Sequence, residues 1–252
     1  MGAPTNLASK AFWEDDYFAG VTLPSRPSMD YPYERTLAGA LTRHAPLARG
    51  QSVVEIGCAP ARWLVWYAET FGAAVTGIEY TEKGARISRE NLVAAGIEGD
   101  IRQGDFFTGE VDGGAFDLVL SLGFIEHFDD LDAVFARHVD FLKPGGRIAI
   151  GVPNFRGLTG ALQRWGDHSF LALHNLDAMR PRRFRGWAAR HGLDLVALEH
   201  LDSLDPQMIR VTRRGPAVVL LPLDRLRRAR WTDRVNHGLF SSYLLGVFRR
   251  RP

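Results

Sequence analysis

Short apolar runs alternate with helix-like segments from residue 52 to residue 152, and this alternation constrains the fold more than any other feature of the chain. We interpret the apolar runs as strands and the segments between them as helices. The expected strands are 52–56, 74–78, 100–103, 116–121 and 147–152, and the expected helices are 62–71, 82–95 and 131–142. Strands that alternate with helices predict an α/β fold with a doubly wound, mostly parallel sheet.

The pattern changes on both sides of this core. Residues 1–32 are rich in aromatic and acidic residues and in proline, and we expect an irregular N-terminal arm or lid there. A helix over 33–44 then begins the main domain. Near the other end, a helix over 182–191 leads to a sixth strand over 193–199, and a last apolar run at 241–248 predicts a seventh strand antiparallel to the sixth.

The main domain is therefore expected to span 33–252, with Lys143-Pro144-Gly145-Gly146 as a sharp turn into the fifth strand. Two long segments interrupt the alternation, at about 155–180 and 203–239. We expect both to be cap-like insertions, the second partly helical.

Composition excludes several classes of protein. No stretch approaches the roughly 18 apolar residues that a membrane span needs, and no signal peptide is evident at the N-terminus. Cys58 is the only cysteine, which fits a reducing cytoplasm. Histidine, cysteine and carboxylate residues lack the spacing of a tetrahedral metal site, so no metal is expected.

Positive charge is concentrated at the C-terminal end of the chain. Residues 207–252 hold eleven Arg and two Asp, whereas the net charge of the whole chain is only +2. Such a region is compatible with nucleic-acid binding. Because arginine is the usual cation throughout the sequence, we favour a solvated Arg-rich face.

The first expected strand ends in a glycine, in the run Val53-Val54-Glu55-Ile56-Gly57. Glycine lets the backbone turn tightly and approach a ligand closely. About 20 residues later the second strand ends at Glu79, at the distance where an acid accepts hydrogen bonds from both hydroxyls of a ribose. The alternative is that Gly57 only turns the chain and Glu79 caps the next helix. The combination of loop, spacing and acid favours a nucleotide-type ligand.

These residues resemble the class I S-adenosylmethionine-dependent methyltransferases. The loop matches the family's first motif, and Glu79 matches its ribose-binding acid. The resemblance continues through Gly104-Asp105-Phe106, Phe116-Asp117-Leu118-Val119 and Leu142-Lys143-Pro144-Gly145-Gly146, and covers about residues 33–152. It implies S-adenosylmethionine as cofactor and S-adenosylhomocysteine as product. The cofactor contacts that it implies are Glu55, Gly57, Cys58, Ala59, Ala61, Glu79, Tyr80, Asp105, Phe106 and Ser121.

One departure concerns the second and third glycines of the first motif, which are Ala59 and Ala61 here. Alanine disfavours a positive φ, so we expect a less contorted loop than a triple-glycine version. The substitution also weighs against a nicotinamide-dependent oxidoreductase, whose Gly-rich turn leaves room for a pyrophosphate.

The candidate catalytic residues follow the fourth strand, in Ser121-Leu122-Gly123-Phe124-Ile125-Glu126-His127-Phe128. This segment is similar to the Glu-His segment of ubiquinone-biosynthesis-type O-methyltransferases, where that region borders the active site. His127 is our candidate general base, with Glu126 beside it, because an ordinary histidine pKa suits proton transfer at neutral pH. The alternative is that the two residues begin the next helix, with His127 bonded to backbone.

The candidate substrate contacts lie in the arm and beyond the fifth strand. Aromatic side chains of the arm provide rings for a lid over the cofactor or the substrate. Polar side chains after the fifth strand provide hydrogen bonds, although for each one alone we favour local turn bonding by the asparagine or an exposed position of the histidine. The complete set is Trp13, Tyr17, Tyr31, Tyr33, Asn154, His174 and Asn175.

The leading hypothesis is transfer of a methyl group to an oxygen or nitrogen of a small-molecule acceptor. The insertion at 155–180 and the arm together would enclose such a molecule. Two alternatives stay open, namely a different displacement on the sulfonium, such as ring closure or aminocarboxypropyl transfer, and methylation of RNA. The sequence does not identify the acceptor or the oligomeric state.

Overall fold

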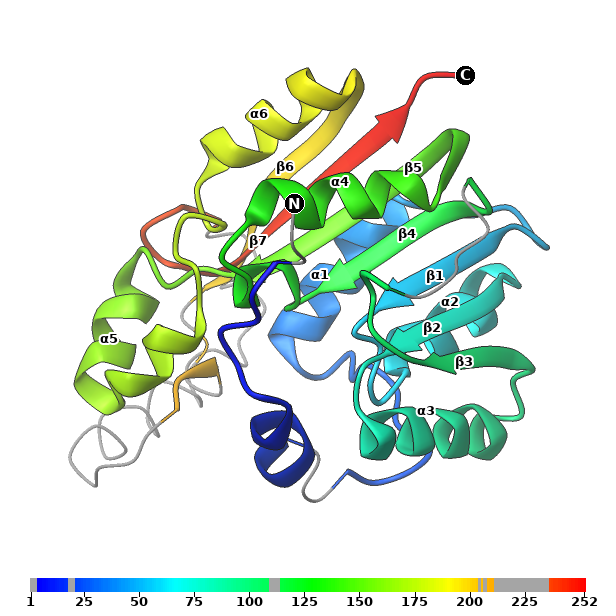
Figure 1. Cartoon of the computed structure of the whole chain (residues 1–252), viewed down its shortest axis with the longest axis horizontal. Coiled ribbons are helices and arrows are strands. Elements are labelled where there is room, and N and C mark those ends of the chain that lie inside the picture. The colour runs from blue at the N-terminus through cyan, green and yellow to red at the C-terminus, as the bar shows by residue number, and fades with distance from the viewer. Residues whose placement is uncertain (1–3, 18–20, 109–113, 204, 206–207, 211–235) are drawn as a thin grey trace.

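A seven-stranded mixed sheet forms the centre of the molecule (Figure 1). The computed structural model describes residues 4–17, 21–108, 114–203, 205, 208–210 and 236–252. The strands are β1 Ser52–Ile56, β2 Ala74–Glu79, β3 Gly99–Gln103, β4 Phe116–Leu122, β5 Leu142–Pro153, β6 Leu193–Ser203 and β7 Ser241–Arg250. Their spatial order is β3-β2-β1-β4-β5-β7-β6, and β7 runs antiparallel to both β5 and β6. The predicted fold class and the antiparallel last strand are confirmed.

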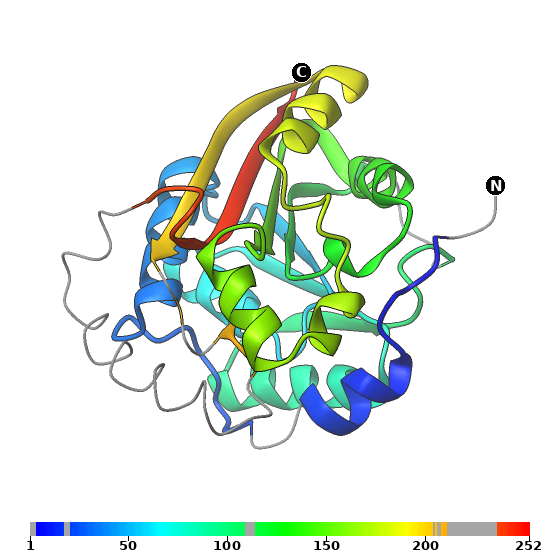
Figure 2. The same cartoon turned by 90° about the vertical axis from the view of Figure 1, so that its left-hand side faces the viewer.

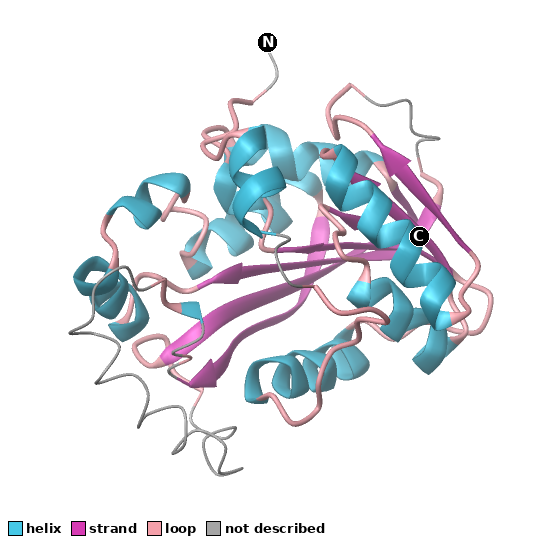
Figure 3. Cartoon of the chain, turned by 90° about the horizontal axis from the view of Figure 1, so that it is seen from below, coloured by secondary structure: helices cyan, strands magenta, loops and turns pink. Residues whose placement is uncertain are grey.

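Helices cover both faces of this sheet (Figure 3). The α-helices are α1 Pro32–His44, α2 Arg62–Phe71, α3 Glu82–Ala95, α4 Leu131–Asp140, α5 Leu158–Gly166 and α6 Pro181–His191. Shorter helical turns are η1 Phe12–Tyr17, η2 Ile125–His127 and η3 Ser169–Leu173. In the described part of the chain, none of these helices is long and apolar enough to cross a membrane.

The central strands are apolar on both faces because they are buried on both sides. Val53 packs in the hydrophobic cluster under α1, α2 and α3, whereas Val54 packs in the cluster under α4 and α6. Leu118 and Val119 of β4 divide between the same two clusters. This explains why the strand signal in the sequence is a continuous apolar run rather than an alternation.

The sheet reverses its winding between β1 and β4, which are adjacent and parallel. From β1 the chain proceeds outward to β2 and β3, and from β4 it proceeds to β5 in the other direction. The loops after β1 and β4 therefore lead from the carboxyl edge of the sheet to opposite faces, where α2 and α4 pack. In open α/β sheets this is where ligands bind.

The N-terminal arm lies along this edge. Leu7 N donates to His127 O at 2.7 Å, and Thr5 and Asp129 exchange hydrogen bonds in both directions. Further along, η1 lies against α3, where Lys83 Nζ donates to Glu14 O at 2.6 Å (Figure 2). The expectation that residues 1–32 are irregular is wrong over Phe12–Tyr17, where a helical turn forms.

Two other expectations differ from the structure, and a third lies mostly outside the described residues. Residues 143–146 belong to β5, where they form a bulge beside β4, so the pairing moves from Phe116↔Leu142 to Leu118↔Arg147. The helix expected over 131–142 ends at Asp140. Of the insertion expected at 203–239, most lies outside the described residues, as does the Arg-rich stretch at 211–235.

The loop after β1 is more contorted than its alanines suggest. Ala61 has a φ of 64° and precedes α2 in the left-handed conformation, and Gly57 has a φ of 69°. The prediction of a less contorted loop is therefore wrong. Ala61 is fully buried in the cluster under α2, and this packing holds the residue in a conformation that costs about 1–2 kcal/mol for an L-residue.

We predict that Ala61→Gly leaves the free energy of unfolding unchanged or raises it by up to about 1 kcal/mol, because glycine removes the penalty for positive φ. The matched control is Ala161→Gly on the exposed face of α5, where the same substitution should cost about 1 kcal/mol. Urea unfolding of the two variants measures both values. Equal destabilisation at the two positions would contradict the account.

Candidate active site

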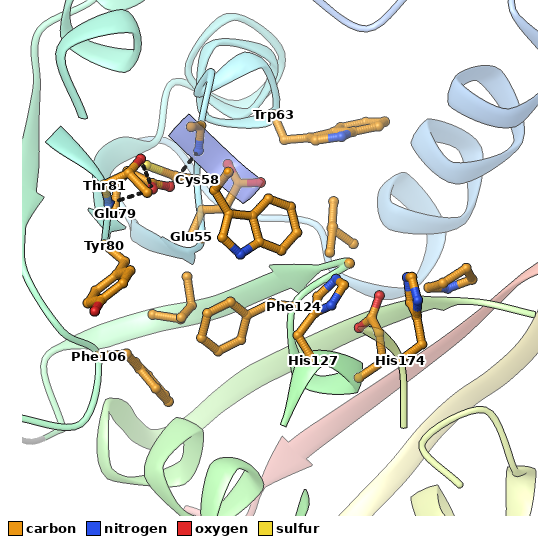
Figure 4. Close-up of a pocket in the computed structure, with 18 of the residues that line it drawn as sticks. Glu55, Cys58, Trp63, Glu79, Tyr80, Thr81, Phe106, Phe124, His127 and His174 are labelled. Carbon is orange, nitrogen blue, oxygen red and sulfur yellow. Dashed lines mark hydrogen bonds between the residues drawn. The ribbon is translucent and has the colours of Figure 1, made fainter. Parts of the chain in front are cut away.

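A cavity of about 420 Å³ opens at the carboxyl edge of the sheet, and its size is ordinary for a small-molecule site (Figure 4). Loops after β1, β2, β4 and β5 form its floor, and the N-terminal arm, η3 and β7 contribute to its walls. The residues predicted from sequence that line it are Trp13, Tyr31, Tyr33, Glu55, Gly57, Cys58, Ala59, Glu79, Tyr80, Phe106, Glu126, His127 and His174.

The other predicted residues are not part of the cavity lining, apart from Tyr17, whose side chain is outside the described part of the protein. Ala61 and Ser121 are fully buried and are not part of the lining. Asp105 turns its carboxylate back onto its own loop, where it accepts from Phe107 N at 2.8 Å. These residues shape the loops that carry the lining.

Two asparagines predicted as substrate contacts make backbone hydrogen bonds instead. Asn154 is buried and donates from Nδ2 to Gly238 O and Ser241 O, both at 2.8 Å. Asn175 donates from its side-chain Nδ2 to Phe128 O at 3.0 Å and from its backbone N–H to Glu126 O at 2.6 Å. Neither lines the cavity. Local turn bonding is present as well, because Asn154 Oδ1 accepts from Arg156 N at 3.3 Å and Asn175 Oδ1 accepts from Asp177 N at 3.2 Å, but the Nδ2 bonds reach distant segments.

Gly57 is needed where β1 meets the cavity. Its amide and that of Cys58 both donate to Ile78 O, at 2.9 and 3.3 Å, which ties the loop to the end of β2. A Cβ on Gly57 would lie 2.8 Å from the ring of Phe124 in the loop after β4. The two loops can therefore approach each other this closely only because residue 57 has no side chain.

Glu79 ends β2 with a buried carboxylate held by local donors. It accepts from Thr81 N at 2.9 Å, from Thr81 Oγ1 at 2.7 Å and from Ala59 N at 3.4 Å. Thr81, not Glu79, caps α3, because its hydroxyl accepts from Gly84 N. Burial raises the pKa of Glu79. The capping alternative considered for Glu79 is therefore wrong.

Glu55 is a second buried acid beside the loop. Its Oε2 has no hydrogen-bond partner among the described residues, and burial raises its pKa well above the usual range. Arg62 at the start of α2 opposes this shift and is itself paired with Glu34. A buried polar atom that faces a cavity without a partner indicates a site built for a ligand.

Glu126 and His127 form the short turn η2 and do not begin a helix. The following helix, α4, starts at Leu131 and is capped by Asp130, which accepts from Asp132 N and Ala133 N. His127 does bond to backbone, through Nδ1 to Leu173 O at 2.8 Å. Glu126 is buried, and its Oε2 has no partner in the described part of the protein.

The titratable groups at this end of the cavity are uncharged near neutral pH. Burial raises the pKa of Glu126 to about 8. Burial and the neighbouring His174 lower the pKa of His127 to about 3, and burial lowers that of His174 to about 4. A carboxylic acid and two neutral imidazoles therefore face the cavity together.

Aromatic rings that we did not predict complete the wall. Tyr33 packs on Tyr243 with ring centres 4.9 Å apart, and Phe155 and Phe170 pack on His174 at 5.1 and 4.7 Å. Phe155 directly follows Asn154 and so carried a positional signal. Tyr243 had none, because its place in the cavity depends on the pairing of β7 with β5. Arg62, Thr81 and Phe124 also line the cavity.

We predict a pH-dependent stability effect from Glu126. The folded protein keeps this proton up to about pH 8, whereas an unfolded glutamate loses it near its ordinary pKa of 4.5. The unfolded state therefore binds fewer protons between these values, and Glu126 lowers stability as the pH rises. Relative to wild type, Glu126→Gln should gain up to about 1.4 kcal/mol per pH unit from pH 5 to 7, measured by urea unfolding.

The control is Glu98→Gln at an exposed position, whose stability should follow that of wild type across the same range. The buried histidines change stability with pH in the opposite direction. Because wild type and both variants retain them, their contribution cancels when the stability curves of the three proteins are compared. Parallel curves for Glu126→Gln and wild type would contradict a raised pKa at Glu126.

Comparison with known proteins agrees with this geometry. Residues 53–146 match the family model described as a methyltransferase domain. The match runs from β1 into β5 and so contains Gly57, Glu79 and the Glu126-His127 turn.

Curated relatives are methyltransferases. The chain is 29% identical over 173 residues to ubiquinone biosynthesis O-methyltransferase of Stutzerimonas stutzeri (strain A1501), covering 64% of this chain and 72% of the relative. It is 29% identical over 104 residues to phosphoethanolamine N-methyltransferase 1 of Triticum aestivum, covering 41% of this chain. That match spans only 21% of the wheat protein.

Solved structures share the fold. Haemonchus contortus phosphoethanolamine N-methyltransferase 2, in complex with S-adenosyl-L-methionine, aligns with a TM-score of 0.61 at 16% identity, over 97% of this chain and 60% of that one. Geranyl diphosphate C-methyltransferase of Streptomyces coelicolor A3(2), in complex with S-adenosyl-L-homocysteine, aligns with a TM-score of 0.60 at 16% identity, over 86% and 78%. The chain therefore contains a methyltransferase domain over residues 53–146, and it shares its fold with solved S-adenosylmethionine-dependent methyltransferases.

Proposed function

We propose that this protein transfers the methyl group of S-adenosylmethionine to an oxygen or nitrogen of a small, uncharged acceptor. The observation that carries the proposal is the acceptor end of the cavity, where aromatic rings surround a buried carboxyl and two imidazoles that are uncharged at neutral pH. Such an environment favours apolar surface and penalises a buried charge.

The cofactor end of the cavity suits S-adenosylmethionine. Glu79 lies at the end of β2 with a buried carboxylate, the position from which a ribose diol is bound in this type of fold. Glu55 adds a buried oxygen without a partner among the described residues, which suits the amino group of the methionine part. The missing side chain of Gly57 leaves room for the ring of Phe124, which lies between this end of the cavity and the acceptor end.

Residues that prepare the acceptor lie on the other side of Phe124. When bound, S-adenosylmethionine would supply a methyl group attached to a positively charged sulfur. The leaving group of the transfer would be a neutral thioether. The rings of Trp13, Phe155 and Phe170 exclude water from this end of the cavity. A nucleophile that starts protonated also needs a proton acceptor.

We propose Glu126, in place of His127, as the general base that accepts this proton. A base works best when its pKa lies near the operating pH, which is met by the Glu126 pKa of about 8 but not by the His127 pKa of about 3. The ionised Glu126 would take the proton of the acceptor hydroxyl or amine during methyl transfer. While Glu126 still carries its own proton, the same hydrogen of the nucleophile bonds to His127 Nε2, which holds the nucleophile in place before transfer.

The described residues provide no spare cation at the acceptor end, and this argues against phosphorylated acceptors. Among the described lining residues, Arg62 is the only arginine or lysine, and it is paired with Glu34 at the cofactor end. Arg210 lies over the rings of Phe12 and Phe170, is 3.7 Å from Asp167 and is not part of the lining. Among the described lining residues, a phosphate at the acceptor end would therefore be buried without a charged partner.

We predict that Glu79→Gln weakens S-adenosylmethionine binding by about 1.5–3 kcal/mol, the contribution of hydrogen bonds to a charged group. Titration calorimetry with the purified protein measures the change. Glu82→Gln, at an exposed position in the first turn of α3, is the control and should bind like wild type. Unchanged affinity in Glu79→Gln would remove Glu79 from the cofactor site.

The proposed activity is tested with S-adenosylmethionine labelled in the methyl group and a panel of phenols, alcohols and aryl amines, each paired with its phosphorylated form. We expect labelled product from uncharged members, with kcat/KM at least about 10²-fold above the phosphorylated partner, because an unpaired buried charge costs several kcal/mol. Release of methylthioadenosine in place of S-adenosylhomocysteine would indicate another reaction on the sulfonium.

In the same assay Glu126→Gln should lower kcat about 10²-fold or more and remove the rise of activity with pH near 8, with cofactor affinity intact. His127→Ala should also lower kcat but keep that pH dependence. His168→Ala, an exposed histidine outside the lining, is the control. Normal turnover in Glu126→Gln would reduce Glu126 to a structural role.

A further inference from the structure

Two imidazoles lie side by side in the acceptor half of the cavity. The ring centres of His127 and His174 are 4.7 Å apart, and the planes are inclined by 50°. They come from different parts of the chain, η2 after β4 and the residue that ends η3 in the cap. Figure 4 shows His127 on the side of Phe124 and the cofactor loop, with His174 beyond it.

The backbone fixes the position of the proton on both rings. His127 Nδ1 lies 2.8 Å from Leu173 O, and His174 Nδ1 lies 2.9 Å from Phe170 O. A carbonyl oxygen can only accept, so Nδ1 carries hydrogen in each ring. Burial keeps both rings neutral near pH 7, as the lowered pKa values indicate. Each Nε2 is therefore a lone-pair acceptor.

Neither Nε2 has a hydrogen-bond partner among the residues that the structure describes, although both histidines line the cavity. The exposed fraction of His127 is 6% and that of His174 is 9%, so bulk water reaches neither side chain freely. Both atoms open onto the cavity, and an acceptor that loses its solvent without gaining a donor is unfavourable. A ligand that fills this part of the cavity is therefore favoured when it brings hydrogen-bond donors to the two neighbouring rings.

We propose that His174 is a specificity-determining residue and that the histidine pair selects an acceptor molecule with two hydroxyl or amino donors on neighbouring atoms. His127, on the cofactor side, receives the donor that is methylated, and His174 receives the second donor. Phe155 and Phe170 pack on the His174 ring and favour a flat molecule at this place. The assignment of the two donors rests on the function proposed above, whereas the binding preference does not require turnover.

The binding test uses the whole protein loaded with S-adenosylhomocysteine and three probes of similar shape, namely benzene-1,2-diol, phenol and 1,2-dimethoxybenzene. Calorimetry should give about tenfold tighter binding for the diol than for phenol, the effect of one additional hydrogen bond to a buried acceptor. The dimethoxy compound, which has no donor, should bind weakest. Equal affinity for diol and phenol would overturn the proposal.

Variants at His174 separate hydrogen bonding from packing. His174→Phe keeps a ring and should make the affinities for diol and phenol equal, with S-adenosylhomocysteine affinity unchanged. His174→Gln places an amide oxygen near the position of Nε2 and should restore part of the preference. A full diol preference in His174→Phe would overturn the role of His174 even if the protein binds the probe.

A spectroscopic readout tests the same proposal without a probe. In ¹⁵N NMR of protein labelled on histidine, the signals absent from His127→Gln and His174→Gln identify the two rings. At pH 7 both should carry hydrogen on Nδ1, which is the minor tautomer of a free histidine side chain. Hydrogen on Nε2 of His174 would overturn the proposal. If diol selectivity holds while no probe is methylated, the binding inference survives and the proposed function fails.

Discussion

The close approach of two loops at the point where the sheet reverses its winding organises this molecule. Hydrogen bonds from Gly57 and Cys58 to the end of β2 hold one loop, and the ring of Phe124 fills the space that a side chain on Gly57 would need. In the function proposed above, the cavity on one side of this contact holds the cofactor, and the cavity on the other side holds the acceptor. The division follows from parallel strands whose carboxyl ends share one edge.

The core and the cofactor loop could be predicted because they depend on local sequence. β1 and β4 are buried on both faces and so appear as continuous apolar runs, and Glu79 occupies a fixed distance from Gly57 in a strand–helix–strand unit. The loop conformation was predicted wrongly, since tertiary packing holds Ala61 at a positive φ that alanine disfavours. Local preference is a weak guide where burial is complete.

The acceptor side was harder to predict because its residues meet only through distant pairing. Tyr243 reaches the cavity through the antiparallel partnership of β7 and β5, and Asn175 uses its amide to hold the loop of Glu126 and His127. Residue type alone suggested a substrate contact for Asn175 and a base for His127. The structure favours a different role for each. Burial lowers the pKa of His127, and Asn175 forms hydrogen bonds with backbone carbonyls.

The way in which the cap fixes the imidazole protons has an evolutionary consequence. The groups responsible are backbone carbonyls of Phe170 and Leu173, so substitutions at these two positions leave the hydrogen-bonding pattern of the site intact as long as η3 keeps its turn. Insertion or deletion of one residue between 169 and 174 would shift the carbonyls and exchange donors for acceptors in the cavity. Relatives of this protein can therefore change cap side chains other than His174 and its packing partner Phe170 and keep this hydrogen-bonding pattern, whereas a change in cap length alters what the cavity recognises.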